Sequence, residues 1–284
     1  MAGSAVIAVC GHEAAYGRAL DGLVDPGVSV VPNGRALFRS IAAHRRRGEE
    51  CVVVPMTLGR DPGLVADAAR TLRAVPGARP GATLLAEPFG TAQHLVGWLR
   101  AAAGRVAAGS ALLVTAPSGD PFEDAELYRI AALVRRYGRR GPVEVAFTGG
   151  EPDVAEGIRR CRLLGAERVA LLSAAFAPAE PAEPAEPADG SSPGTGSAGP
   201  LLPAAALRRV LAERVAGARQ RWSAHGDDGV TAGLGAADHH GHAHTHPPGE
   251  GHDHATGHHH GHGPAHTHRH PSADGADRAI RSIA

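Results

Sequence analysis

The sequence predicts an α/β protein of two similar lobes, each with a parallel sheet flanked by helices, followed by a disordered histidine-rich tail. Apolar runs of strand length alternate with segments of helical periodicity, which is typical of βα units and a parallel sheet. This alternation starts again in the second half of the chain, and the two halves can be aligned with each other. The last segment, 223–284, has almost no apolar side chains and cannot bury a core.

The first lobe is expected over residues 1–108. Residues 34–47 place Leu37, Ile41 and His44 on one helical face, and residues 64–72 carry a second apolar stripe. Asp61 and Pro62 mark the start of that second helix, because Asp can cap it and Pro fits its first turn. The expected strands are rich in Val, Leu and Ala and lie at 5–9, 28–31, 51–54 and 83–86.

The second lobe is expected over residues 109–222, and its strands and helices alternate at 111–115, 120–137, 143–147, 154–164 and 169–173. One constant offset matches Leu37, Ile41, Gly48 and Val52 with Val154, Ile158, Gly165 and Val169. An internal repeat of this length implies two lobes with a cleft between them. Thr115-Ala116-Pro117 stands where the first lobe has Cys10-Gly11-His12, so we expect the second lobe to serve mainly for shape.

The end of the second lobe is less regular. Ala-Glu-Pro repeats and a Gly/Ser-rich run predict a linker at 178–200. Residues 201–222 then form a helix whose apolar face is expected to pack on the second lobe and contains Leu207, Val210, Leu211 and Val215. The tail, 223–284, is expected to be disordered without metal.

The composition excludes several classes of protein. Net charge is zero, which gives no reason to expect a nucleic acid or a membrane surface as partner. Cys10, Cys51 and Cys161 are far apart and form no CxxC pattern, which indicates reduced thiols. No apolar run approaches the ~18 residues of a spanning helix, and no basic and apolar leader is present. We therefore expect a cytoplasmic protein, and leave a homodimer open.

The first strand ends in Cys10-Gly11-His12-Glu13, which makes His12 the first candidate for chemistry. Ligands of open α/β sheets bind at the carboxyl ends of strands. The alternative is a histidine that caps the next helix or bonds a buried carbonyl. Arg60 and Asp61 follow the third strand and are expected at the rim of the same cleft, although a simple N-cap would also explain Asp61.

The tail is expected to bind divalent metal ions. Neutral imidazole is a good ligand for nickel, copper, zinc and iron, and cobalt lies in the same affinity series. The alternative is a solvated low-complexity segment. The predicted tail ligands are His239, His240, His242, His244, His246, His252, His254, His258, His259, His260, His262, His266, His268 and His270.

Four stretches carry a resemblance to a known family: Ser118–Pro121, Ala125–Arg129, Glu151-Pro152 and Leu164–Val169. With Gly11-His12 and the histidine-rich extension, residues 4–222 resemble the class II tetrapyrrole chelatases of the CbiX/SirB type. The resemblance implies insertion of cobalt, or of iron, into sirohydrochlorin on the way to cobalamin or sirohaem. It implies a divalent metal substrate and no organic cofactor.

The resemblance also implies roles for the candidate residues. His12 would be a metal ligand or base, Glu13 or Asp61 a second ligand, and Arg60 an anchor for the carboxylates of the tetrapyrrole. The chain departs from the family at three places. Glu13-Ala14 replaces the usual Gly-Ser, Arg60-Asp61 stands where a second histidine is usual, and Pro32-Asn33-Gly34 replaces an acidic residue.

Cobalt insertion is the expected function, with nickel as a further possible metal and iron insertion for sirohaem as an alternative. A second alternative is a non-catalytic protein that stores or delivers cobalt, nickel or zinc on a degenerate chelatase fold, which the absent second histidine favours. A third is a periplasmic-type binder of small molecules, against which the missing leader argues.

Overall fold

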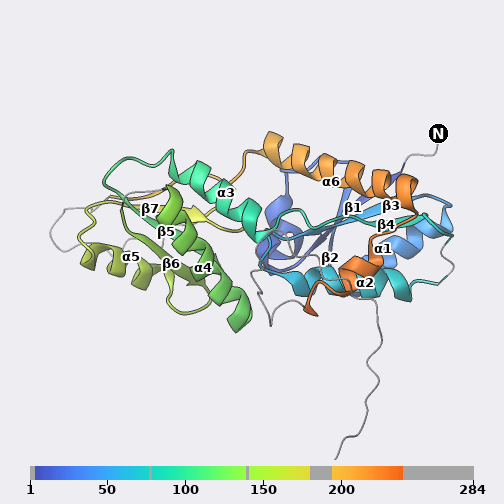
Figure 1. The fold of residues 1–284 in the computed structure, drawn as a ribbon, viewed down its shortest axis with the longest axis horizontal. Coiled ribbons are helices and arrows are strands. Elements are labelled where there is room, and N and C mark those ends of the chain that lie inside the picture. Colours follow the sequence, from blue (N-terminus) through green and yellow to red (C-terminus); the bar gives the residue numbers. More distant parts are fainter. Residues whose placement is uncertain (1–3, 77–78, 139–140, 180–193, 239–284) are drawn as a thin grey trace, which may run out of the picture. The chain divides into compact units, whose positions relative to one another are not determined.

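Two four-stranded parallel sheets organise the computed structural model, which describes residues 4–76, 79–138, 141–179 and 194–238 (Figure 1). The first sheet has the order β2-β1-β3-β4 and the second the order β6-β5-β7-β8. The predicted α/β class and the two parallel sheets flanked by helices are confirmed. The strands are β1 (Ala5–Cys10), β2 (Val28–Pro32), β3 (Cys51–Met56), β4 (Thr83–Leu85), β5 (Ala111–Pro117), β6 (Val143–Thr148), β7 (Val169–Ser173) and β8 (Thr195–Ser197).

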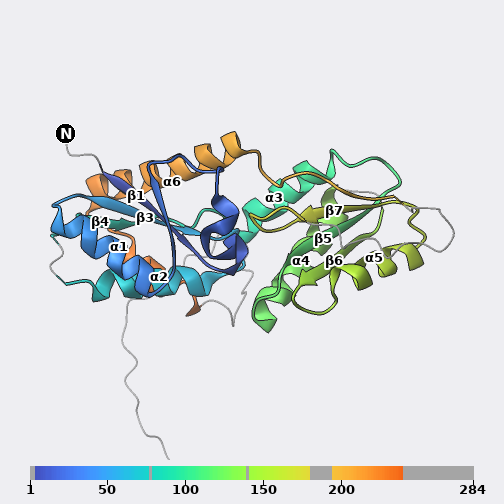
Figure 2. The ribbon, with the colours of Figure 1, turned by 180° about the vertical axis from the view of Figure 1, so that it is seen from behind.

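Alternate side chains of the first sheet enter two different cores. Ile7 and Val53 pack with α1 (Arg35–Arg46) and α2 (Pro62–Ala74) on one face. Ala8 and Val54 belong to the core on the opposite face, where α6 (Ala204–His225) lies. Figure 2 shows α6 along one side of this sheet and α1 and α2 along the other.

The second sheet is covered in the same way. α3 (Ala92–Ala103) and α4 (Pro121–Gly138) pack together on one face, and α5 (Val154–Leu163) covers the other. α3 follows the first sheet in the chain but packs against α4 and β7. The first half of the chain therefore supplies a helix to the second lobe.

The helix expected to pack on the second lobe was assigned to the wrong sheet. α6 contacts β3 and β4, and its buried residues Leu207, Leu211 and Val215 join the core of the first sheet. Arg214 fixes it further by donating from Nε to the carbonyl oxygen of Phe89 at 3.2 Å. The apolar face was visible in the sequence, but its periodicity does not specify which sheet it covers.

The boundaries expected for the linker and the tail were also wrong in part. Thr195–Ser197, inside the expected linker, pairs with Val169–Leu171 as edge strand β8. Residues 223–225 complete α6, and α7 (Val230–Leu234) then packs on α2 with Val230 buried. The amide of Leu85 also donates to the carbonyl oxygen of Asp228 at 2.8 Å. Residues 180–193 and all fourteen tail histidines lie outside the described residues.

The register places the expected site at the carboxyl ends of the two inner strands of the first sheet. Cys10 pairs with Met56, so β1 and β3 end side by side and the loops that follow them are neighbours. Within the described ranges, no helix has the length and apolar character needed to cross a membrane.

The packing of α7 on α2 predicts that two truncated forms of the chain differ in stability. Ending it after residue 222 removes buried Val230 and the Asp228 bond, which should lower the free energy of unfolding by about 2 kcal/mol or more. Ending it after residue 238 keeps both contacts and should leave the stability unchanged. Urea denaturation compares the two proteins, and equal midpoints would show that α7 does not stabilise the first lobe.

Candidate metal centre

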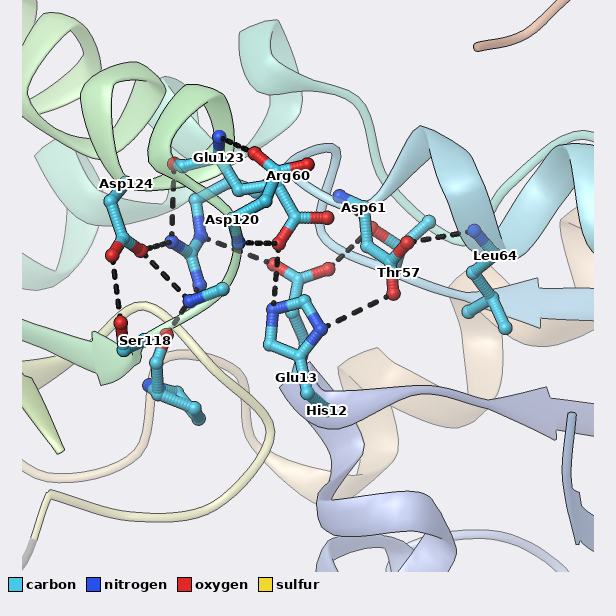
Figure 3. A network of polar contacts seen from close by, with 12 residues as sticks. His12, Glu13, Thr57, Arg60, Asp61, Leu64, Ser118, Asp120, Glu123 and Asp124 are labelled. Carbon is cyan, nitrogen blue, oxygen red and sulfur yellow. Dashed lines mark hydrogen bonds and ion pairs between the residues drawn. The ribbon is translucent and has the colours of Figure 1, made fainter. Parts of the chain in front are cut away.

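His12 lies between two carboxylates from different parts of the chain (Figure 3). Its Nδ1 is 3.4 Å from Oδ2 of Asp61, and its Nε2 is 3.5 Å from Oε2 of Glu123. The ligand atoms offered by the three residues all lie within 4.8 Å of one another. His12 Nε2 is buried and has no hydrogen-bond partner among the described residues. A buried, unpartnered imidazole nitrogen beside a carboxylate suits a bound cation.

The turn after β1 makes this approach possible. Gly11 precedes His12, and a Cβ at Gly11 would collide with Oδ2 of Asp61. After it, His12–Leu20 forms a 3₁₀ segment instead of a regular helix, with Ala15 and Tyr16 in the left-handed region at φ 48° and 56°. Left-handed backbone is costly for residues other than glycine and tends to occur at functional sites.

Asp61 has two roles. Its Oδ1 accepts the amide of Leu64 at 2.7 Å and so caps α2, while Oδ2 faces His12. The sequence left open whether Asp61 is an N-cap or lies at the candidate site. The structure shows that its carboxylate caps α2 and contacts His12 at the same time. Asp61 is therefore fixed by the helix that it caps.

Glu123 is the residue that the sequence analysis missed. It lies in the first turn of α4, where the Glu123 amide donates to Oδ1 of Asp120 at 2.8 Å and the Asp120 amide donates to Oε2 of Glu123 at 3.1 Å. Gly119 leaves room for this, because a Cβ there would overlap the Glu123 carboxylate. Asp120-x-x-Glu123 directly after a strand is a capping box, and this signal could have indicated the residue. The second lobe, expected to serve mainly for shape, therefore places a carboxylate beside His12.

Glu13 and Arg60 do not lie where they were expected. Glu13 is buried, accepts hydrogen bonds from the Thr57 hydroxyl and, at 2.9 Å, from the Leu58 amide, and has Oε1 3.4 Å from Nε of Arg60. The Arg60 side chain is 0% exposed. Glu13 is therefore engaged inside the protein instead of facing the unpartnered nitrogen of His12, and Arg60 cannot anchor a substrate carboxylate at the rim.

Burial and charge change the pKa values in the cluster. Burial lowers the pKa of His12, but the bond to Asp61 and the charges of Glu123, Glu13 and Asp61 outweigh it and raise that pKa above its ordinary value. Burial raises the pKa of Glu123, and the charge of His12 opposes this rise. Burial likewise raises the pKa of Glu13, against the opposing charge of Arg60. The same negative field that retains a proton on His12 would attract a divalent cation.

The ligand types narrow the choice of cation. One imidazole nitrogen with carboxylate oxygens suits cobalt, iron, nickel or zinc in the divalent state. A cavity of about 380 Å³ adjoins the cluster, since Thr57 and Asp61 lie in its wall with the apolar residues Val65, Leu85 and Ala232. Of the three cluster residues, Asp61 alone lines this cavity.

The other described histidines lie outside this cluster, and two of them have local structural contacts. His44 lies at the end of α1 with Nδ1 2.7 Å from Glu49, as the expected helix-face residue. His94 takes part in the capping box of α3 with Thr91 and stacks on Trp98. His225 is exposed at the end of α6.

The pair His12–Asp61 predicts a measurable change in proton affinity. Asp61→Asn keeps an oxygen to cap α2 but removes the charge that raises the pKa of His12, so that pKa should fall. Titration of the imidazole by NMR measures it. Asp67→Asn, which changes an exposed carboxylate on the same helix, is the control and should leave the titration unchanged. An unaltered pKa in Asp61→Asn would mean that the contact is absent in solution.

Comparison with known proteins assigns no role to these residues. No protein-family model matches the chain, and no curated protein matches it.

Proposed function

We propose that the protein inserts a divalent metal, cobalt above all, into sirohydrochlorin, and that His12 and Glu123 hold the metal before its transfer while Asp61 orients the imidazole. The observation that carries this proposal is the buried, unpartnered Nε2 of His12, 3.5 Å from the Glu123 carboxylate. His12 begins the 3₁₀ segment after β1 and Glu123 lies in the first turn of α4 after β5, and β1 and β5 occupy equivalent places in the two sheets. The resemblance in sequence to class II chelatases supports the same reading.

Each residue has a distinct task in this proposal. Nε2 of His12 and the carboxylate of Glu123 bind the metal substrate, while Asp61 accepts from Nδ1 and fixes the tautomer and orientation of the ring. Insertion exchanges one divalent metal for two pyrrole protons, so two protons must leave and no electron is transferred. The raised pKa of Glu123 makes it a better acceptor for such a proton than an ordinary carboxylate. The apolar cavity beside Asp61 offers surface for one edge of the macrocycle.

The same ligand set would accept ferrous iron, so iron insertion for sirohaem is the alternative within this enzyme class. A different candidate is storage or delivery of metal without turnover. It is favoured by Asp61, which stands where chelatases usually have a second histidine and is already directed at His12. The fourteen histidines of 239–270 would then be the main metal sites.

The insertion proposal predicts that His12→Ala abolishes catalysis. The assay follows sirohydrochlorin absorbance anaerobically at fixed free Co²⁺, Fe²⁺ or Ni²⁺, with the full chain. Glu123→Gln should raise the free metal concentration needed for half-maximal insertion by about tenfold or more, because the charge of one ligand is lost. His225→Ala removes an exposed histidine outside the cluster and should match the native rate. A native chain that is no faster than the uncatalysed reaction would reject the proposal.

The two classes of function respond differently to removal of 239–284. A chelatase should keep its insertion rate at saturating metal. A metal-storage protein should lose most of its bound metal ions and should show no insertion activity with or without the tail. Metal stoichiometry by elemental analysis and the insertion assay are measured on the same preparations. Truncation after 238, not after 222, is required because α7 belongs to the folded protein.

A further inference from the structure

Arg60 connects the two parts of the candidate metal centre. From the first lobe, Oε1 of Glu13 lies 3.4 Å from its Nε. From the second lobe, the carbonyl oxygen of Pro117 accepts from Nη2 at 3.2 Å and that of Glu123 accepts from Nη1 at 3.4 Å. Asp124 lies 3.9 Å from Nη1. The guanidinium therefore contacts both lobes at the level of the cluster (Figure 3).

Arg60 is fully buried and its charge faces Glu13, although its Nε has no hydrogen-bond partner among the described residues. A fully buried cation is costly unless its charge and its donors are paired. The planar fork of arginine presents donors in several fixed directions, which the single ammonium of lysine cannot reproduce. The positions of Pro117, Glu123 and Glu13 are consequently tied to one rigid group.

These contacts determine where the metal ligands lie. Glu13 follows His12 directly in the chain, and its carboxylate is also bonded to Thr57 and Leu58. The main chain of Glu123 is bonded to Arg60, while its side chain approaches His12 Nε2. A shift of Arg60 would change the separation between His12 and Glu123 without touching either side chain.

We propose that Arg60 is a positioning residue that sets the separation of His12 and Glu123, and with it the affinity and geometry of the metal centre. This inference rests on the proposed metal site and replaces the expected role of Arg60 as an anchor for substrate. The planar guanidinium of Arg60 with its several donors, and not its charge alone, aligns the ligands from the two lobes.

The test uses cobalt spectroscopy on the full chain at buffered free Co²⁺. The tail is the same in every variant, so the difference between a protein and its His12→Ala partner isolates the cluster. Arg60→Lys keeps the buried charge and loses the fork. We expect a folded protein by circular dichroism whose His12-dependent Co²⁺ absorption is altered and whose Kd is raised about tenfold or more. Arg105→Lys, at an arginine that bonds the Pro200 carbonyl, is the matched control and should retain the native signal.

The outcomes separate the two proposals. If the native chain shows no His12-dependent absorption, the metal centre itself is rejected. If that absorption is present and Arg60→Lys retains its spectrum and Kd, the metal centre stands and the positioning role is overturned. If Arg60→Lys does not fold, Asp124→Asn replaces it in the same comparison, since this change loosens one contact of the fork. An altered spectrum then supports the role, and a native one overturns it.

Discussion

The pairing of a buried guanidinium is the interaction on which the candidate site depends. Carboxylates from both lobes gather at the ends of β1, β3 and β5, namely Glu13, Asp61, Asp120, Glu123 and Asp124. Like charges at such distances repel each other, and burial increases the cost. Arg60 offsets part of this repulsion from inside. What remains is a negative field around His12, which raises the pKa of that histidine and suits a divalent cation.

Each half of the chain supplies a helix that covers the sheet of the other half, and this joins the two lobes. α3 follows the first sheet but covers the second, and α6 follows the second sheet but covers the first. The resulting apolar core runs through both lobes and includes Val54 and Leu207 as well as Leu95 and Val114. A continuous core of close-packed side chains resists relative movement. This packing keeps the two lobes in place, so that Arg60 can align His12 of the first lobe with Glu123 of the second.

The two halves of the repeat have diverged at their strand ends. The first half supplies an imidazole after its central strand β1, and the second supplies a carboxylate after its central strand β5. In the proposed metal site, the carboxylate of Glu123 is a harder ligand than a second histidine would be, and it adds negative charge. Under the proposed function, these carboxylates would take up protons when the metal leaves, since metal binding and protonation compete for the same ligands.

The sequence alone determined the strands β1 to β7, the repeat and the place of His12, because these depend on local apolar runs and on residues that follow one another; the edge strand β8, which lacks such a run, was missed. Asp61 could be placed for the same reason, since it caps the helix that begins at Pro62. Glu123 and the true role of Arg60 were decided only by tertiary structure, because they are 63 positions apart and meet through the packing of two lobes. The position of α6 was decided in the same way. Its apolar face fits a sheet, and only the folded chain selects which sheet buries it.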